Sequence, residues 1–198
     1  METDPKPIYG NWAHGWALDQ HTLRSRQDGG GAPGRPRFTS ERSEIGEALY
    51  RLKYRLDRSQ VAPIARAVVE FVRCRPELSD VGAVLAVPPS NADRSFQPVE
   101  AIAFAVAAEL GLPSPDDYLL KVKPTSALKN MEDTRERREE LDGAFAVADR
   151  RFQDLHVLLF DDLFRSGETL KAVTVTLLFE GKVGNVSVVT ATYARSKT

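Results

Sequence analysis

Two adjacent carboxylates and a small-residue turn stand close together near the C-terminal end of the chain. Asp161 and Asp162 directly follow the apolar run 157–160, which is typical of a parallel strand covered on both faces. The turn 165–169 comes next, and a helical pattern begins at about Gly167. Because ligands of open α/β sheets bind at the carboxyl edge of the strands, we expect the acids and the turn to face one ligand there.

The acid pair and the turn favour different parts of a ligand. Free backbone N–H groups and the positive end of a helix dipole attract an anion at the start of the helix. Carboxylates repel a bare phosphate, but they accept hydrogen bonds from vicinal hydroxyls and bind a Mg²⁺ ion carried by a polyphosphate. A ribose 5-phosphate meets both demands. The alternative is that this acidic strand-to-helix turn is only solvated.

The elements that would position these residues alternate between strand and helix. Apolar runs predict strands at 81–87, 118–122, 143–147, 156–160 and 186–192. Helical spacing predicts helices at 98–110 and 167–180, each followed by a glycine, although the run 172–176 is rich in β-branched residues. Alternation of this kind predicts an α/β fold in which a parallel, Rossmann-like sheet is flanked by helices.

Two more helices are expected ahead of the alternating part. The first begins with Ser40 as its N-cap, and the second follows Ser59 with Pro63 in its first turn. The expected inward faces are Ile45, Leu49, Leu52 and Leu56 in the first helix, and Ile64, Val68, Phe71 and Val72 in the second.

The first 37 residues have few aliphatic positions and end in the Gly- and Pro-rich stretch 28–37. This composition predicts a non-regular N-terminal segment, and we divide the chain into an extension with a linker at 1–39 and a domain at 40–198. The segment contains Trp12, His14, Trp16, Asp19 and His21. Three interpretations stay open: a metal site, a base-stacking surface, or an aromatic segment that docks on the core. The histidine spacing does not define a zinc site.

Overall composition narrows the class of protein. A chain of 198 residues with 42% hydrophobic residues buries one good core. Its net charge of -1 argues against bulk attraction to nucleic acid or anionic membranes. Cys74 is the single cysteine, which excludes an intrachain disulfide and a cysteine-based zinc site. No apolar run is long enough for a membrane span, and the N-terminus lacks an export signal, so we expect a cytoplasmic protein.

The stretch 157–169 resembles the 5-phosphoribosyl-1-pyrophosphate (PRPP) motif of type I phosphoribosyltransferases, with four apolar residues, two acids and a small, hydroxyl-rich turn. The family usually has two threonines before the glycine, where this chain has Arg165 and Ser166. Ser166 keeps a hydroxyl. The guanidinium of Arg165 either grips phosphate or blocks it.

Other segments are similar to the ComF-like group of this family. They are 48–54 (a Leu-Lys-Tyr helix), 87–97 (a Pro-containing strand end and then Arg-Ser-Phe-Gln), 123–129 and 137–145. Ser95, Gln97 and Glu140 depart from the group's usual glycine, asparagine and asparagine. The four-cysteine zinc ribbon that commonly begins ComF-like proteins is missing from this sequence.

The resemblance implies a type I phosphoribosyltransferase fold and a role for each matching residue. Asp161 and Asp162 would hold the ribose hydroxyls and Mg²⁺, and would stabilise positive charge on the ring during catalysis. The phosphate would lie on Arg165, Ser166, Gly167, Glu168 and Thr169, and the pyrophosphate on Pro89, Ser90, Asn91 and Arg94. The polar stretch 124–142 would be either a solvated loop or a loop that closes over the substrate, with Lys129 and Arg137 reaching the pyrophosphate.

The expected activity is transfer of phosphoribose from PRPP to an unidentified acceptor, with release of pyrophosphate. The alternative is a non-catalytic protein that senses a ribose 5-phosphate nucleotide or assists DNA uptake, as ComF-like proteins do. In that case Arg24, Arg26, Arg35 and Arg37 would contact single-stranded DNA, a less favoured partner. A homodimer is compatible with the exposed faces of such a sheet.

Overall fold

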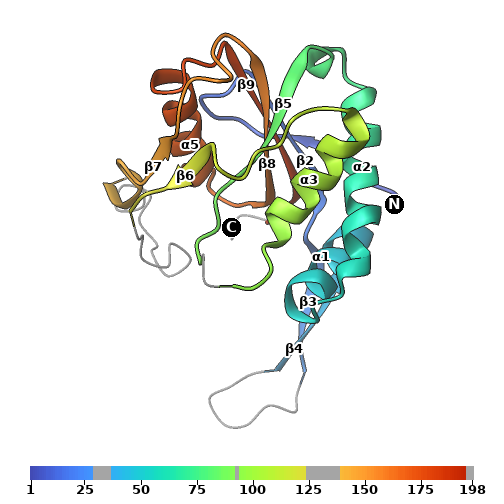
Figure 1. Cartoon of the computed structure of the whole chain (residues 1–198). Helices are drawn as coiled ribbons and strands as arrows, with labels where there is room; N and C mark the ends of the chain where they lie inside the picture. Colours follow the sequence, from blue (N-terminus) through green and yellow to red (C-terminus); the bar gives the residue numbers. More distant parts are fainter. Residues whose placement is uncertain (29–36, 92–93, 124–138, 195–198) are drawn as a thin grey trace.

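A five-stranded sheet with the order β1-β2-β9-β8-β5 forms the centre of the protein (Figure 1). The structure is a computed structural model that describes residues 1–28, 37–91, 94–123 and 139–194. The strands are β1 (Lys6–Pro7), β2 (His14–Gln20), β5 (Val81–Ala86), β8 (His156–Phe164) and β9 (Asn185–Tyr193). All pairs are parallel except β1 with β2. The predicted α/β class and the mostly parallel sheet are confirmed.

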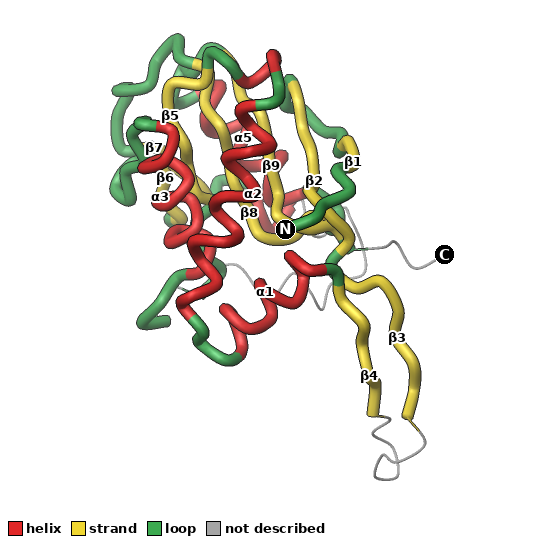
Figure 2. The backbone as a smooth tube through the Cα atoms, turned by 90° about the vertical axis from the view of Figure 1, so that its right-hand side faces the viewer, coloured by secondary structure: helices red, strands yellow, loops and turns green. Residues whose placement is uncertain are grey.

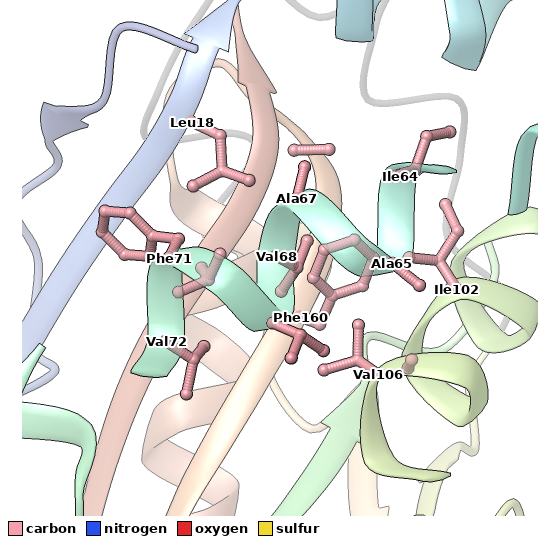
Figure 3. Packing of buried hydrophobic residues seen from close by; sticks show 14 of the residues in the cluster. Leu18, Ile64, Ala65, Ala67, Val68, Phe71, Val72, Ile102, Val106 and Phe160 are labelled. Carbon is pink, nitrogen blue, oxygen red and sulfur yellow. The ribbon is translucent and has the colours of Figure 1, made fainter. Parts of the chain in front are cut away.

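Three helices cover one face of this sheet, namely α1 (Glu44–Tyr54), α2 (Val61–Arg73) and α3 (Pro98–Leu110). Two short 3-10 turns, Arg58–Gln60 and Pro76–Leu78, flank α2. Figure 3 shows apolar side chains of α2 packed against α3 and against the sheet. The predicted inward residues Ile64, Val68, Phe71 and Val72 are all buried. Helical spacing therefore identified this face correctly.

The opposite face of the sheet is covered by α5 (Glu168–Phe179) and by a small antiparallel pair, β6 (Leu119–Lys121) with β7 (Phe145–Val147). The β-branched run in α5 is helical, as the length of the segment predicts. The sheet is thus the middle of three layers. Because β5, β8 and β9 pair in parallel, their carboxyl ends lie along one edge. No helix among the described residues has the length and apolarity needed to cross a bilayer.

A β-hairpin formed by β3 (Thr22–Asp28) and β4 (Arg37–Arg42) projects from the body of the protein at the end where α1 begins (Figures 1 and 2). Its two strands form a sheet of their own. The hairpin follows β2 directly along the chain.

The expectation of a non-regular N-terminal segment is wrong, because residues 6–28 contain three strands. β2 pairs in parallel with β9 and adds a strand to the central sheet. Ala17 and Leu18 are both fully buried, one against each face. The sequence of β2 contains one aliphatic pair among polar and aromatic residues, so it shows no clear alternation of apolar and polar residues that would predict a strand. The strand exists because a distant partner supplies its hydrogen bonds, which local pattern does not reveal.

The first helix also begins later than predicted. Ser40 lies in β4, and the N-cap is Ser43, whose hydroxyl accepts a hydrogen bond from the backbone N–H of Gly46 at 3.2 Å. Ile45, Leu49 and Leu52 are buried as expected. Leu56 is 67% exposed, since the helix ends before it and its φ is +54°. Both serines are good caps, and pairing of β4 with β3 decides between them.

Candidate functional site

The acid pair lies within a strand and not after its end. β8 continues past Asp161 and Asp162 to Phe164, because β9 pairs with it as far as Tyr193. On the other side, β5 ends at Ala86, and the N–H of the next residue, Val87, donates to the carbonyl of Phe160 at 2.9 Å. The two carboxylates therefore border an opening that β5 leaves at the carboxyl edge of the sheet.

Because strand side chains alternate, the two carboxylates leave β8 toward opposite faces. Asp162 shares the face of Phe160, which packs with the α1–α3 layer. Its carboxylate forms an ion pair with Lys53 of α1, and the side chain of Asp162 is only 10% exposed. Asp161 shares the face of Leu159, which packs with the α5 layer. One acid thus has a cationic partner and the other faces the start of α5.

The environment of Asp161 disfavours its charge. Its side chain accepts a hydrogen bond from the backbone N–H of Asp162 at 2.8 Å. Burial, together with the neighbouring negative charge of Asp162, nevertheless raises the pKa of Asp161 to about 7, against the opposing effects of that hydrogen bond and of Lys53. Asp161 therefore takes up a proton far more readily than an exposed aspartate.

A cavity of about 210 Å³ opens beside the acid pair. It is bordered by seven of the residues that sequence reasoning selected: Pro89, Ser90, Asn91, Arg94, Asp161, Asp162 and Thr169. Gln97 holds the loop that contributes the first four, since its side-chain amide donates to the carbonyl oxygens of Asn91 at 2.9 Å and of Arg94 at 3.4 Å. The cavity is thus lined by the polar loop after β5, the acids of β8 and a residue of the first turn of α5.

The rest of the predicted phosphate turn lies outside the lining of this cavity. Arg165 is exposed and Ser166 is half-buried. Gly167 is the N-cap of α5 with φ of +75°, and a Cβ atom there would come within 2.8 Å of the Phe164 ring. Glu168 is buried and pairs with Lys171 at 2.7 Å, on the side of a different cavity. Of the five predicted phosphate ligands, only Thr169 borders the cavity.

Sequence reasoning missed Lys53 and the cluster behind the acid pair. The hydroxyl of Thr192 in β9 donates to the carbonyl oxygen of Asp162 at 2.9 Å, and Nδ1 of His21 lies 3.2 Å from that hydroxyl oxygen. Burial lowers the pKa of His21, and the charges of Lys53 and Arg42 lower it further. The signal for Lys53 was present in the helix 48–54, where Lys is the polar residue next to the buried face. Sequence reasoning considered His21 only as part of an N-terminal metal site or aromatic surface, and no signal pointed to Thr192.

Two predicted residues, Lys129 and Arg137, lie outside the described residues. Their role as candidates for a closing loop stays a prediction. The described part of that stretch begins at Glu139 and leads into β7.

The N-terminal aromatic residues pack on the body of the protein. Trp12 is buried, its Nε1 donates to the carbonyl of Ile8 at 3.1 Å, and its ring meets Phe164 edge-to-face at 6.4 Å. Trp16 lies between His14 and Phe71, with ring centroids 5.9 Å and 5.6 Å away. Docking on the core is therefore the interpretation that the contacts support. Across the described ranges, no three His, Cys, Asp or Glu side chains converge as metal ligands would.

Comparisons with models of known protein families and with curated proteins find no match to this chain. The fold and the cavity define only a broad class: the chain is an α/β protein with a polar cavity at the carboxyl edge of a mostly parallel sheet. That edge is where such folds bind ligands. The particular ligand follows from the chemistry of the lining residues.

Proposed function

We propose that the protein binds a ribose 5-phosphate compound, of which PRPP is the first candidate. It would transfer the phosphoribosyl group of PRPP to an acceptor with release of pyrophosphate. This makes it a phosphoribosyltransferase-like protein, akin to the ComF-like group of the type I family. The observation that carries the proposal is the convergence of the acid pair, Thr169 and the loop 88–91 on one cavity.

The lining residues suit the parts of such a ligand. The carboxylates of Asp161 and Asp162 accept hydrogen bonds from the two ribose hydroxyls. Thr169 and the N-terminal turn of α5 suit the 5-phosphate, because a helix start presents backbone N–H groups to an anion. Ser90, Asn91 and the cation Arg94 suit the pyrophosphate. A sugar that carries an anion at each end matches this arrangement of acids between donors.

The transfer forms a bond between the acceptor atom and C1 of the ribose while the bond from C1 to the pyrophosphate oxygen breaks. The electrons of the broken bond leave with the pyrophosphate, and the acceptor loses its proton when it is an amine or a ring N–H. Positive charge develops on the ring as the pyrophosphate departs. The negative charge of Asp162, close to that ring, stabilises the transition state.

The resemblance also implies Mg²⁺ at Asp161 and Asp162. Lys53 already forms an ion pair with the ionised carboxylate of Asp162, and the Asp161 side chain accepts the N–H of its neighbour. This arrangement does not fit an ion held directly by both carboxylates, so we assign no step to a protein-held metal.

Calorimetric titration with PRPP and with ribose 5-phosphate tests the proposal. We compare the wild type with an Asp161→Asn/Asp162→Asn double variant, and use Asp154→Asn, an exposed position outside the cavity, as the matched control. We expect the double variant to lose at least tenfold in affinity, since two charge-assisted hydrogen bonds are weakened. Equal affinity of all three proteins, or no binding by the wild type, contradicts the proposed function.

One observation favours the alternative of an accessory protein that contacts single-stranded DNA. The β3–β4 hairpin projects from the body and carries Arg24 and Arg26 on exposed positions (Figure 2). Trp12 and Trp16 pack on the core, so binding of single-stranded DNA would rest on the charge of the arginines and not on tryptophan stacking. An Arg24→Ala/Arg26→Ala variant would then weaken binding to a fluorescent oligonucleotide and leave PRPP binding unchanged.

A further inference from the structure

The ion pair between Lys53 and Asp162 connects the N-terminal half of the chain to the acid pair, and it gives the proposed phosphosugar site a cation of its own. Lys53 comes from α1, more than a hundred residues before its partner in β8. It borders the same cavity as Pro89, Asn91 and Thr169. The following inference rests on the proposed function of that cavity.

The position of Lys53 is determined by the packing of α1. Ile45, Leu49 and Leu52 bury one face of this helix against the sheet. Lys53 is the next residue around the helix, so its side chain leaves at the margin of the buried face and is 25% exposed. It reaches the face of β8 to which Asp162 points. The contact is thus a consequence of helix periodicity and strand alternation together.

The position of Asp162, the acid of the ion pair with Lys53, is equally constrained. Its backbone carbonyl accepts the hydroxyl of Thr192, and its carboxylate is nearly buried. A nearly buried carboxylate without a cation is strongly disfavoured. In many sites with two neighbouring carboxylates a divalent ion supplies the compensating charge. Here an ammonium group from the chain already does so.

We propose that Lys53 is the built-in counter-cation of the acid pair, a positioning residue that holds Asp162 ready for the ribose hydroxyls and takes the place of a protein-held divalent ion. Two consequences follow. The protein without sugar phosphate has low affinity for divalent ions, and ribose 5-phosphate binds without them. Removal of the lysine charge turns the acid pair into a metal site.

Mn²⁺ binding, followed by electron paramagnetic resonance of the free ion, tests this directly. The proteins are the wild type, Lys53→Met, Lys53→Arg and the control Lys182→Met, which removes an exposed lysine outside the cavity. We expect Lys53→Met to bind one Mn²⁺ at least tenfold more tightly than the wild type, because a nearby positive charge has been removed. Lys53→Arg and Lys182→Met should behave as the wild type.

A second variant guards against loss of folding. Lys53→Gln keeps a hydrogen-bond donor toward Asp162 while it removes the charge, and circular dichroism verifies that the variant is folded. Equal Mn²⁺ affinity in wild type and folded Lys53→Gln overturns the proposal, as does tight binding of Mn²⁺ by the wild type at this cavity.

Ribose 5-phosphate binding in the presence of EDTA gives an independent readout. The wild type should bind equally well with EDTA and with Mg²⁺, whereas Lys53→Gln should bind better with Mg²⁺. A wild type that binds the sugar phosphate only with Mg²⁺ overturns the inference. Because the Mn²⁺ experiment contains no sugar phosphate, failure of the proposed function and failure of the role of Lys53 give different results.

Discussion

The two edges of the central sheet carry similar sets of side chains but differ in access. At the carboxyl edge, Lys53, Asp162 and Thr192 bring together a cation, an acid and a hydroxyl. At the amino edge, His156 lies between Asp80 and Ser187, with Nδ1 2.6 Å from the Asp80 carboxylate and Nε2 2.8 Å from the Ser187 hydroxyl. The second set has the residue types and the order of a nucleophilic triad.

Burial alone does not separate the two, since Thr192 is as buried as Ser187 and Asp162 is as buried as His156, so the difference is whether a cavity reaches the set. Ser187 is fully buried and His156 is 7% exposed, so a substrate cannot reach that hydroxyl. Asp162 borders a cavity lined by loops after β5 and β8. Polar side chains therefore tie strands together at the amino edge, whereas Lys53 and Asp162 border a cavity at the carboxyl edge. Residue types and hydrogen bonds alone do not define a site, because catalysis also requires an opening for the substrate.

A mutation at the amino edge should change the stability of the protein and not its ligand binding. The largest loss of stability is expected for His156. His156→Ala removes a buried ring and leaves the Ser187 hydroxyl without this partner, so we expect a loss of about 3 kcal/mol in the free energy of unfolding. Urea unfolding at neutral pH measures it. Ligand binding by the folded fraction should stay unchanged. A stable variant with altered PRPP affinity would show that the amino edge takes part in function.

Gly167→Ala tests whether the turn at the carboxyl edge needs its backbone shape. The positive φ and the 2.8 Å approach of a Cβ atom to Phe164 should together cost about 2 kcal/mol. Gly111→Ala is the matched control, because its φ is +70° and a Cβ atom there meets nothing within 4 Å. Thermal unfolding should show a smaller loss for the control. Equal losses would mean that the contact with Phe164 has no cost.

The smallest expected effect is a change in the pH dependence of stability at Asp161. Its pKa is raised to about 7 in the folded protein from an ordinary 3.8. Between these values the folded state keeps a proton that the unfolded state has lost, so stability falls as pH rises through this window.

Asp161→Asn should therefore be more stable than the wild type near pH 8, by on the order of 1 kcal/mol because the group is partly exposed, and the two should converge near pH 4. Melting temperatures across this range measure the difference. Asp154→Asn should follow the wild type throughout. A stability difference between Asp161→Asn and the wild type that does not grow between pH 4 and pH 7 would contradict the raised pKa.

Much of the fold and part of the cavity followed from local patterns. The apolar run 157–160, the helical spacing of α2 and α3 and the glycine after α3 each predicted an element that the structure contains. Asp161, Asp162 and Thr169 were selected because parallel strands end at one edge, whereas the loop 88–91 was selected from the resemblance to the ComF-like group. All of these residues border the cavity. These predictions succeed because periodicity and chain order act over short distances.

The amino-acid sequence by itself determined the class of fold, the edge that carries the acids and the faces that the helices bury. Only the tertiary structure decided that β2 joins the sheet, that Lys53 meets Asp162 and that His156 serves packing. Each of these depends on a partner far away in the chain, and β2 lies beside β9 at a separation of about 170 residues. Local propensity carries no information about such partners, because their hydrogen bonds and charges meet only when the layers pack.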